Sequence, residues 1–293
     1  MPDPPLRSLD HLVIRVRDLD AATATYRALL GRAPSWRGEH PQWGTSNVLF
    51  RLENTYVELL GVPQSAPDTG PFAIPPGEPP EGASMLAFGT ADAEAFRRHA
   101  EERGLRPSAV QPGRGVDLDT GAVRAWANVF LPRTATHGAR IFVIEHRSPA
   151  AALPPARPEH GDETATAHAV DHVVVRTRDG DRARTLYGDA LGIRLALDRR
   201  FPEWGARLLF FRLGHLTVEL AAPLEPPADP PADDHFWGVS YRVRDAVAAR
   251  ARLLAAGIAT SEVRAGRKPG TRVLTVEGEP CGVPTLLLEP AAD

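Results

Sequence analysis

The sequence predicts an α+β protein built from four βαβββ modules that form two tandem domains. One observation behind this prediction is an internal repeat: the stretch Leu9–Gly31 returns, little changed, as Val170–Gly192, and each copy opens with Asp-His within three residues. A second observation is that equivalent residues are 161 positions apart throughout, so neither copy has gained an insertion. Constant spacing over this length indicates duplication. The equivalent pairs are His11 and His172, Tyr26 and Tyr187, Trp43 and Trp204, and Glu58 and Glu219.

Each copy reads as a strand, a helix and three further strands. The stretch His11–Val16 alternates and is rich in β-branched residues, which favours a strand. Residues 18–31 are typical of a helix, with Asp18 or Asp20 suited to the N-cap and Gly31 to a left-handed C-cap. Strands are then predicted at residues 34–39, 46–52 and 55–61.

The segment that follows each copy repeats this order more faintly. A strand from Ser84 leads into a helix that ends at Gly104, and the partner helix ends at Gly257. Strands are predicted at residues 124–132, 139–146, 271–278 and 284–290. The glycine-containing stretches at residues 113–115 and 266–270 are predicted to be hairpin loops.

Proline-rich segments divide the chain. The first domain is predicted at residues 8–146 and the second at 169–291, joined by a linker at 147–168 that offers little to pack. We therefore expect limited proteolysis to cut this linker first. Shorter breaks at residues 75–82 and 223–234 are predicted to join the modules within each domain.

Composition narrows the function classes. A net charge of −3 gives no reason to expect nucleic acid or an anionic membrane as a partner. Cys281 is the single cysteine, which excludes a disulfide within the chain, and it is predicted to be a packed thiol. No apolar leader or membrane span stands out, so a cytoplasmic protein is expected.

Strand alternation predicts which side chains share a face. His11, Val13 and Arg15 lie on one side of the first strand, and Tyr56, Glu58 and Leu60 share one side of the last. In the second copy, the same alternation puts His172, Val174 and Arg176 on one face of their strand and gives Glu219 the position of Glu58. The faces that carry His and Glu are expected to line a concave cup.

The Asp-His strand, the helix of the form D-L-D-x-A-x-x-x-Y…L-G and the final Val-Glu-Leu strand resemble the vicinal oxygen chelate superfamily. That group includes glyoxalase I, extradiol dioxygenases, methylmalonyl-CoA epimerase and bleomycin-resistance proteins, and the glyoxalase-like branch is the most similar. The resemblance covers nearly the whole chain and implies a cup in which His and Glu bind a divalent metal, such as Zn, Ni, Mn or Fe. The implied metal ligands are His11, Glu58, His172 and Glu219.

The second module of each domain departs from this family pattern. The remaining ligand positions fall at Met85 and Phe142 in the first half, and at Gly238 and Leu286 in the second, none of which suits such an ion. Each cup then keeps half a site, unless the two repeated modules pair with one another. Loop histidines could supply a third ligand, namely His40, His137 and His146 in the first half, and His215 and His235 in the second.

A structural interpretation stands beside the metal site. Because a buried carboxylate needs a partner, Arg15 could pair with Glu58 and Arg176 with Glu219 as a hydrogen-bonded cluster. The Pro-x-Trp-Gly pattern at residues 41–44 and 202–205 fits either a turn that covers the core or a loop at the mouth of the cup.

The leading functional hypothesis is a glyoxalase-like lyase or isomerase in which an ion polarises vicinal oxygens. Glu58 would shuttle a proton, Arg15 would neutralise a substrate carboxylate, and His40 would serve as a ligand or proton carrier. The alternative is a bleomycin-resistance-like binding protein without turnover. A dioxygenase comes third because its ligands are missing. A small-molecule ligand is the expected partner, a homodimer is compatible with this class, and the first cup is expected to carry the function.

Overall fold

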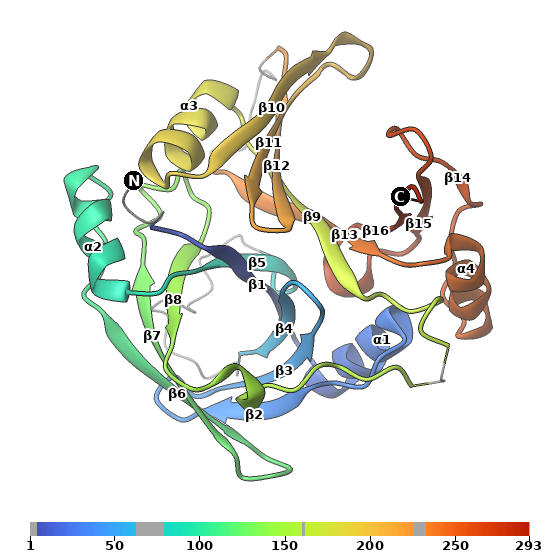
Figure 1. The fold of residues 1–293 in the computed structure, drawn as a ribbon, viewed down its shortest axis with the longest axis horizontal. Helices are drawn as coiled ribbons and strands as arrows, with labels where there is room; N and C mark the ends of the chain where they lie inside the picture. Colours follow the sequence, from blue (N-terminus) through green and yellow to red (C-terminus); the bar gives the residue numbers. More distant parts are fainter. Residues whose placement is uncertain (1–4, 63–78, 160–161, 226–232, 293) are drawn as a thin grey trace.

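The computed structural model describes residues 5–62, 79–159, 162–225 and 233–292 and contains two sheets. The first half forms a closed barrel in the order β1-β4-β3-β2-β6-β7-β8-β5, which appears as a ring in Figure 1. The second half forms an eight-stranded sheet in the order β10-β11-β12-β9-β13-β16-β15-β14. The predicted mixture of helices and strands in tandem modules is confirmed.

The barrel combines two modules. The first comprises β1 (Ser8–Val16), α1 (Leu19–Leu30), β2 (Trp36–His40), β3 (Thr45–Arg51) and β4 (Tyr56–Gly61). The second comprises β5 (Gly82–Gly89), α2 (Ala93–Glu102), β6 (Gln111–Asp117), β7 (Val123–Phe130) and β8 (Ile141–His146). Pairing of β1 with β5 and of β2 with β6 closes the ring.

The second half repeats this order, but its sheet stays open. Its third module comprises β9 (Ala169–Arg176), the helical segment α3 (Gly180–Arg184) with η2 (Thr185–Ala190), β10 (Arg194–Phe201), β11 (Ala206–Leu213) and β12 (Leu216–Pro223). The fourth comprises β13 (His235–Arg242), α4 (Ala246–Ala255), β14 (Arg264–Ala265), β15 (Arg272–Val276) and β16 (Thr285–Glu289). Among the described residues, the two modules are joined in the sheet only by the pairing of β9 with β13, since β10 and β14 are the sheet edges.

The caps of α1 explain its length. The Asp18 carboxylate accepts hydrogen bonds from the backbone N–H groups of Asp20 and Ala21, so Asp18 rather than Asp20 is the N-cap. Gly31 ends the helix with φ 69°, in the left-handed region that a residue with a Cβ atom rarely adopts. This strand–helix boundary was predictable because both signals are local.

The predicted loop at residues 113–115 is wrong, because these residues lie inside β6. A Cβ atom on Gly113 would lie 2.1 Å from Nε1 of Trp126, so the glycine leaves room for the indole on the neighbouring strand. The prediction failed because Gln-Pro-Gly-Arg-Gly reads locally as a turn. By contrast, residues 266–270 do connect β14 and β15.

The segment between the halves is anchored at a few buried residues, although many of its described residues are exposed. Leu153, Ala156 and Ala165–Ala167 are buried, and Arg32 donates hydrogen bonds to the backbone oxygens of Ala156 and Ala167. The largest buried cluster also contains residues of both halves, including Tyr26 and Tyr241. Residues 147–168 therefore contact both halves at these points, and cleavage within the segment stays a prediction. The predicted breaks at 75–82 and 223–234 lie largely outside the described residues.

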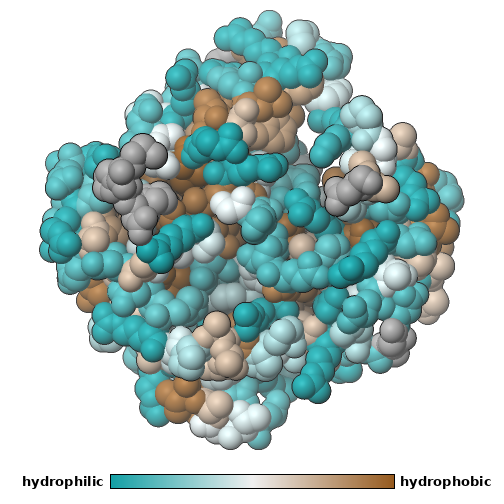
Figure 2. Space-filling model, viewed as in Figure 1, coloured by the Kyte–Doolittle hydropathy of each residue, from teal (hydrophilic) through white to brown (hydrophobic). Residues whose placement is uncertain are grey.

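The two faces of the barrel wall have different surroundings. Leu12, Ile14 and Val16 belong to the large cluster with the helices. Val13 belongs to a separate, smaller cluster with residues of β4, β5, β7 and β8. The alternation predicted for β1 thus separates an outer core from the barrel interior. No helix in the described ranges is both long and apolar enough to cross a membrane. Figure 2 shows a face of the molecule on which hydrophilic side chains predominate and apolar ones are scattered.

Candidate active site in the first barrel

A cavity of about 30 Å³ lies inside the barrel. About 10–15 Å³ measured in this way holds one water, so the space admits a few ligand atoms at most. Both modules contribute to its wall. Its lining residues are His11, Trp36, His40, Trp43, Asn47, Leu49, Tyr56, Glu58, Gly115, Arg124, Trp126, Asn128, Phe142 and Ile144.

His11 is held on both ring nitrogens by carboxylates. Its Nδ1 lies 2.7 Å from Oδ1 of Asp10, and its Nε2 lies 3.2 Å from Oε2 of Glu58. The imidazole stacks on the Tyr56 ring with centroids 4.4 Å apart, and the Phe142 ring meets its edge. The repeated Asp-His therefore has a physical purpose: Asp10 orients the ring and directs Nε2 at Glu58.

The cluster stabilises charged forms in a buried place. Burial alone would raise the pKa of Glu58, but the hydrogen bond and attraction from His11, together with the Asn47 hydrogen bond, lower it below its usual range. Burial alone would lower the pKa of His11, but Asp10 and Glu58 raise it above its usual range. The cluster therefore favours an ionised Glu58 and a protonated His11.

Asn47 and His40 extend this network on β3 and β2. The amide nitrogen of Asn47 donates to Oε1 of Glu58 at 2.7 Å and lies 3.2 Å from Nε2 of His40. His40 Nδ1 lies 2.9 Å from the Thr45 hydroxyl. Since burial lowers the pKa of His40, this neutral ring accepts at Nε2 and donates at Nδ1. Nε2 of His40 and Oε1 of Glu58 are then both hydrogen-bond acceptors. The Asn47 amide must therefore point its nitrogen, which is the donor, toward them.

The opposite wall confirms the apolar replacements. In the first module, Val13 on β1 pairs with Glu58 on β4. In the second module, Ala87 on β5 pairs with Phe142 on β8 in the same way. Phe142 therefore occupies the position of Glu58, and Met85, two residues before Ala87, occupies that of His11. Met85 and Phe142 are buried in the interior cluster. The register gives Gly238 and Leu286 the same places in the second half.

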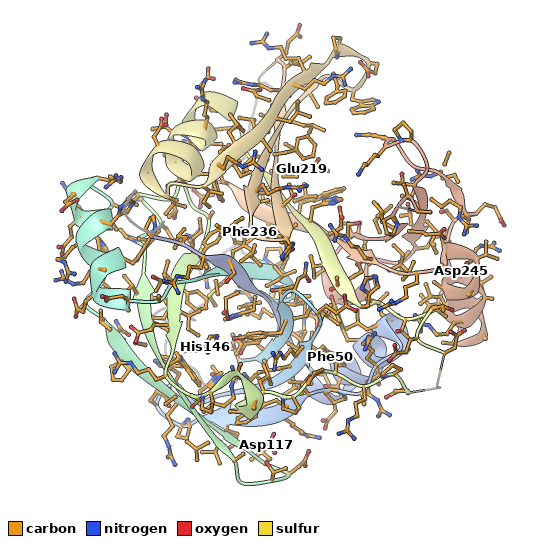
Figure 3. All side chains as sticks on the ribbon, viewed as in Figure 1. Phe50, Asp117, His146, Glu219, Phe236 and Asp245 are labelled. Atoms are coloured by element: carbon orange, nitrogen blue, oxygen red, sulfur yellow. The ribbon has the colours of Figure 1, made fainter. Side chains whose placement is uncertain are left out.

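The donor set does not fit the ion that the resemblance implies. The modules pair as first with second and third with fourth, so the two His-Glu pairs lie in different sheets, and Figure 3 shows Glu219 on the sheet away from the barrel. Within the described residues, no three His, Cys, Asp or Glu side chains come together in a way that could hold a metal ion. Catalytic zinc sites, for example, have three protein ligands, and His11 with Glu58 gives two.

Arg15 lies away from the cavity residues with which it was predicted to act. Its side chain donates to the backbone oxygens of Pro79 and Pro80, and it does not line the cavity. Every second residue of a strand lies on the same face, about 7 Å farther along. Val13 therefore lies between His11 and Arg15 on this face of β1. The predicted Arg15–Glu58 pairing is wrong, because His11 and Asn47 hold Glu58 instead.

The second half keeps the same pair in a more open place. His172 Nδ1 lies 2.8 Å from Asp171, and its Nε2 lies 3.7 Å from Oε2 of Glu219. Burial raises the pKa of Glu219, and attraction to His172 and Arg267 offsets this only in part. Arg176 stacks on Trp237 at 4.3 Å instead of pairing with Glu219.

The other candidate histidines are dispersed. His146 lies 2.9 Å from Oδ2 of Asp10, behind His11, and His40 lines the cavity. His137 and His235 lie away from it, and His215 is exposed at the turn between β11 and β12. In the Pro-x-Trp-Gly stretches, Trp43 lines the cavity next to His40, whereas Trp204 is 43% exposed.

Sequence reasoning missed three polar residues of the cavity: Asn47, Asn128 and Arg124. Asn47 pairs with Leu60 on β4 as Asn128 pairs with Ile144 on β8, so the two asparagines hold equivalent positions. The available signal was the Asn-Val dipeptide in both strands. It was weak because asparagine is uncommon inside strands.

The fold and site define a class: tandem βαβββ modules with an Asp-His strand and a Glu strand that meet inside a cup. Residues 9–168 match the family described as "Glyoxalase-like domain", and residues 171–275 match the "Glyoxalase/Bleomycin resistance protein/Dioxygenase superfamily". The chain belongs to this glyoxalase-like family, also known as the vicinal oxygen chelate superfamily.

Similar proteins span several chemistries. An ethylmalonyl-CoA/methylmalonyl-CoA epimerase of Cereibacter sphaeroides is 31% identical over 99 residues, which are 33% of this chain and 72% of the epimerase. A mutant of 4-hydroxymandelate synthase from Streptomyces coelicolor has a TM-score of 0.68 at 16% identity, covering 99% of this chain and 94% of that chain. The Mn(II)-bound glyoxalase from Novosphingobium aromaticivorans has a TM-score of 0.63 at 15% identity, covering 97% and 82%. The two structures share the fold.

Proposed function

We propose that the first barrel is the active site of a glyoxalase-like lyase or isomerase that moves a proton next to a carbonyl group of a small molecule. The observation that carries the proposal is the buried chain Asp10–His11–Glu58 at the cavity wall. It sets an ionised carboxylate beside an imidazolium, which are a base and an acid within reach of the same few ligand atoms.

In the proposed step, Glu58 removes a proton from the carbon next to the carbonyl. The electron pair of the C–H bond moves into the carbonyl, and His11 stabilises the oxygen that becomes negative by donating from Nε2. Return of a proton to the opposite face of the same carbon gives an epimer. Return to the former carbonyl carbon gives an isomer if an adjacent hydroxyl group passes its proton to the enolate oxygen and becomes the new carbonyl. Asn47 holds Glu58 in place through Oε1 and leaves further lone pairs on the carboxylate free to accept the proton.

The epimerase relative supports this reaction type. Epimerisation at carbon requires that a C–H bond be broken and remade, and that relative is the one at 31% identity. The residues that could perform the transfer in this chain lie on β1 and β4, in its first module.

Solvent exchange tests the proposal directly. The protein is incubated in deuterium oxide with small hydroxycarbonyl compounds and acyl thioesters, and NMR follows deuterium uptake next to the carbonyl. Uptake by the wild-type protein that is lost in Glu58→Gln supports the proposal. Equal uptake by both proteins contradicts it.

No step of this reaction is routed through a metal ion, because two donors do not make the family's ion site. Elemental analysis of protein purified without an affinity tag tests this separately. A stoichiometric Zn, Ni, Mn or Fe that is lost in Glu58→Gln would show that His11 and Glu58 hold an ion after all.

A binding protein without turnover is the second candidate. Met85, Phe142 and the indoles of Trp36, Trp43 and Trp126 make much of the barrel interior apolar and aromatic, which suits retention of a ligand. Ligand binding without deuterium uptake in any substrate class would favour this candidate over the enzyme.

A further inference from the structure

Arg124 is a buried cation with which no carboxylate of the described residues pairs. Only 7% of the residue is exposed, and its guanidinium lies 5.4 Å from the centre of the Trp36 ring and 5.7 Å from that of Tyr56. In the described part of the chain, no carboxylate forms an ion pair with it. A buried charge is costly unless it is paired, and its contacts with two aromatic rings offset only part of that cost.

The place of Arg124 joins two spaces. Together with Tyr56, Arg124 lines both the inner cavity and an outer pocket of about 280 Å³. The segment after β8 covers this outer pocket, with Leu153 buried against Trp36 and Tyr56 and with Arg51 donating to the backbone oxygen of Ala150. The inner cavity and the outer pocket therefore adjoin at Arg124 and Tyr56.

The polar groups of the inner cavity are suited to a hydrogen-bond donor rather than to an anion. The side-chain oxygens of Asn47 and Asn128 are buried and have no hydrogen-bond partner among the described residues. The neighbours of Asn47 fix its amide nitrogen toward Glu58 and His40, so its oxygen stays an acceptor. An orphaned buried acceptor costs about 1–3 kcal/mol, which a hydroxyl group donated by a ligand would recover.

The second half lacks this arrangement. The positions equivalent to Asn47 and Asn128 are Leu208 on β11 and Val273 on β15, which follow from the repeat spacing and from the pairing of Val273 with Leu288. Of these two pairs of equivalent positions, only the pair in the first barrel carries polar acceptors.

We propose that the first barrel recognises a small hydroxycarboxylate, with Arg124 as the residue that binds the carboxylate and Asn47 and Asn128 as acceptors for its hydroxyl. A guanidinium suits a carboxylate because its parallel N–H groups can donate to both oxygens. The small inner volume admits the hydroxyl end, and the outer pocket holds the remainder. This inference names the substrate class of the proposed enzyme and rests on that proposal only for turnover.

Binding of three probes tests the recognition without any reaction. Lactamide lacks the negative charge of lactate, and propionate lacks its hydroxyl group. Binding is followed by the fluorescence of Trp36, Trp43 and Trp126, which line the cavity. We expect lactate to bind at least tenfold more tightly than either analogue. Arg124→Gln removes the advantage over lactamide, Asn128→Leu removes the advantage over propionate, and Arg114→Gln, an exposed change on the adjacent strand β6, alters neither.

Thermal unfolding separates recognition from a structural role. Because no carboxylate of the described residues pairs with Arg124, Arg124→Gln should leave the melting temperature unchanged or raise it, and Arg124→Lys should keep part of the lactate affinity. Equal affinity of the wild-type protein for lactate and lactamide, or a lower melting temperature of Arg124→Gln with unchanged binding, would overturn the inference. A wild-type protein that prefers lactate but takes up no deuterium would contradict the proposed reaction alone.

Discussion

Nε2 of His11 and Oε2 of Glu58 lie 3.2 Å apart in a closed barrel, whereas the equivalent atoms of His172 and Glu219 lie 3.7 Å apart in an open sheet. The side chains of the first pair are 3% and 10% exposed, and those of the second are 20% and 16% exposed. The same sequence pattern thus gives a desolvated, tightly held pair in one half and a wetter pair in the other. Electrostatic interactions are stronger where water is excluded.

The two glutamates should therefore differ in importance. Glu58→Gln should lower the rate of deuterium uptake by on the order of 10²-fold or more, the usual contribution of a positioned base. Glu219→Gln is the matched control and should change that rate little, with metal content and ligand binding measured on both variants. Equal losses, or a larger loss for Glu219→Gln, would assign the activity to the second half.

Stability should depend on pH through this cluster. The pKa of His11 is raised above its ordinary 6.5, so its stabilising effect is complete below pH 6.5 and is lost as the pH rises through the higher folded value. The pKa of Glu58 is lowered below 4.5, so its contribution is present above that pH and is lost as the pH falls. The melting temperature of the wild-type protein should thus fall from pH 6.5 to 9 more than that of His11→Gln. Parallel curves would show that His11 gains no stabilisation from its partners.

Extradiol ring cleavage should be absent. The reaction needs iron with open coordination positions, and the cup opposite His11 and Glu58 presents Met85 and Phe142. We expect protein incubated with ferrous iron to leave catechol unchanged, as followed by the absorbance of the ring-opened product. Turnover that survives chelation of free iron would contradict the assignment of these positions.

The packing of Gly113 on β6 against Trp126 can be tested by measuring stability. Gly113→Ala would set a Cβ atom against the Trp126 indole, and overpacking of this kind costs roughly 1–3 kcal/mol. Gly61→Ala is the control, because its Cβ atom would meet its nearest neighbour at an ordinary 3.5 Å. Denaturant unfolding should show a lower free energy of unfolding for the first variant alone. Equal stabilities would mean that Trp126 moves aside freely.

The sequence by itself determined the modules, their caps and the face of each strand. These features are local or periodic: Asp18 and Gly31 act within one helix, and alternation along β1 sets His11 apart from Leu12 whatever the partner strand. The repeat spacing also matched His11 with His172 and Glu58 with Glu219, and the resemblance placed each pair in a cup. Met85 and Phe142 were correctly predicted to replace the remaining ligands.

Only the tertiary structure decided which modules pair, that one sheet closes, and which arginine faces the cavity. Arg15 and Arg124 are alike in the sequence, but a barrel wall turns one toward the carbonyls of Pro79 and Pro80 and the other toward the ring of Tyr56. The packing of Leu153 against Trp36 and Tyr56 depends likewise on contacts between residues far apart in the chain. Such contacts depend on the shape of the closed barrel, which no local pattern encodes.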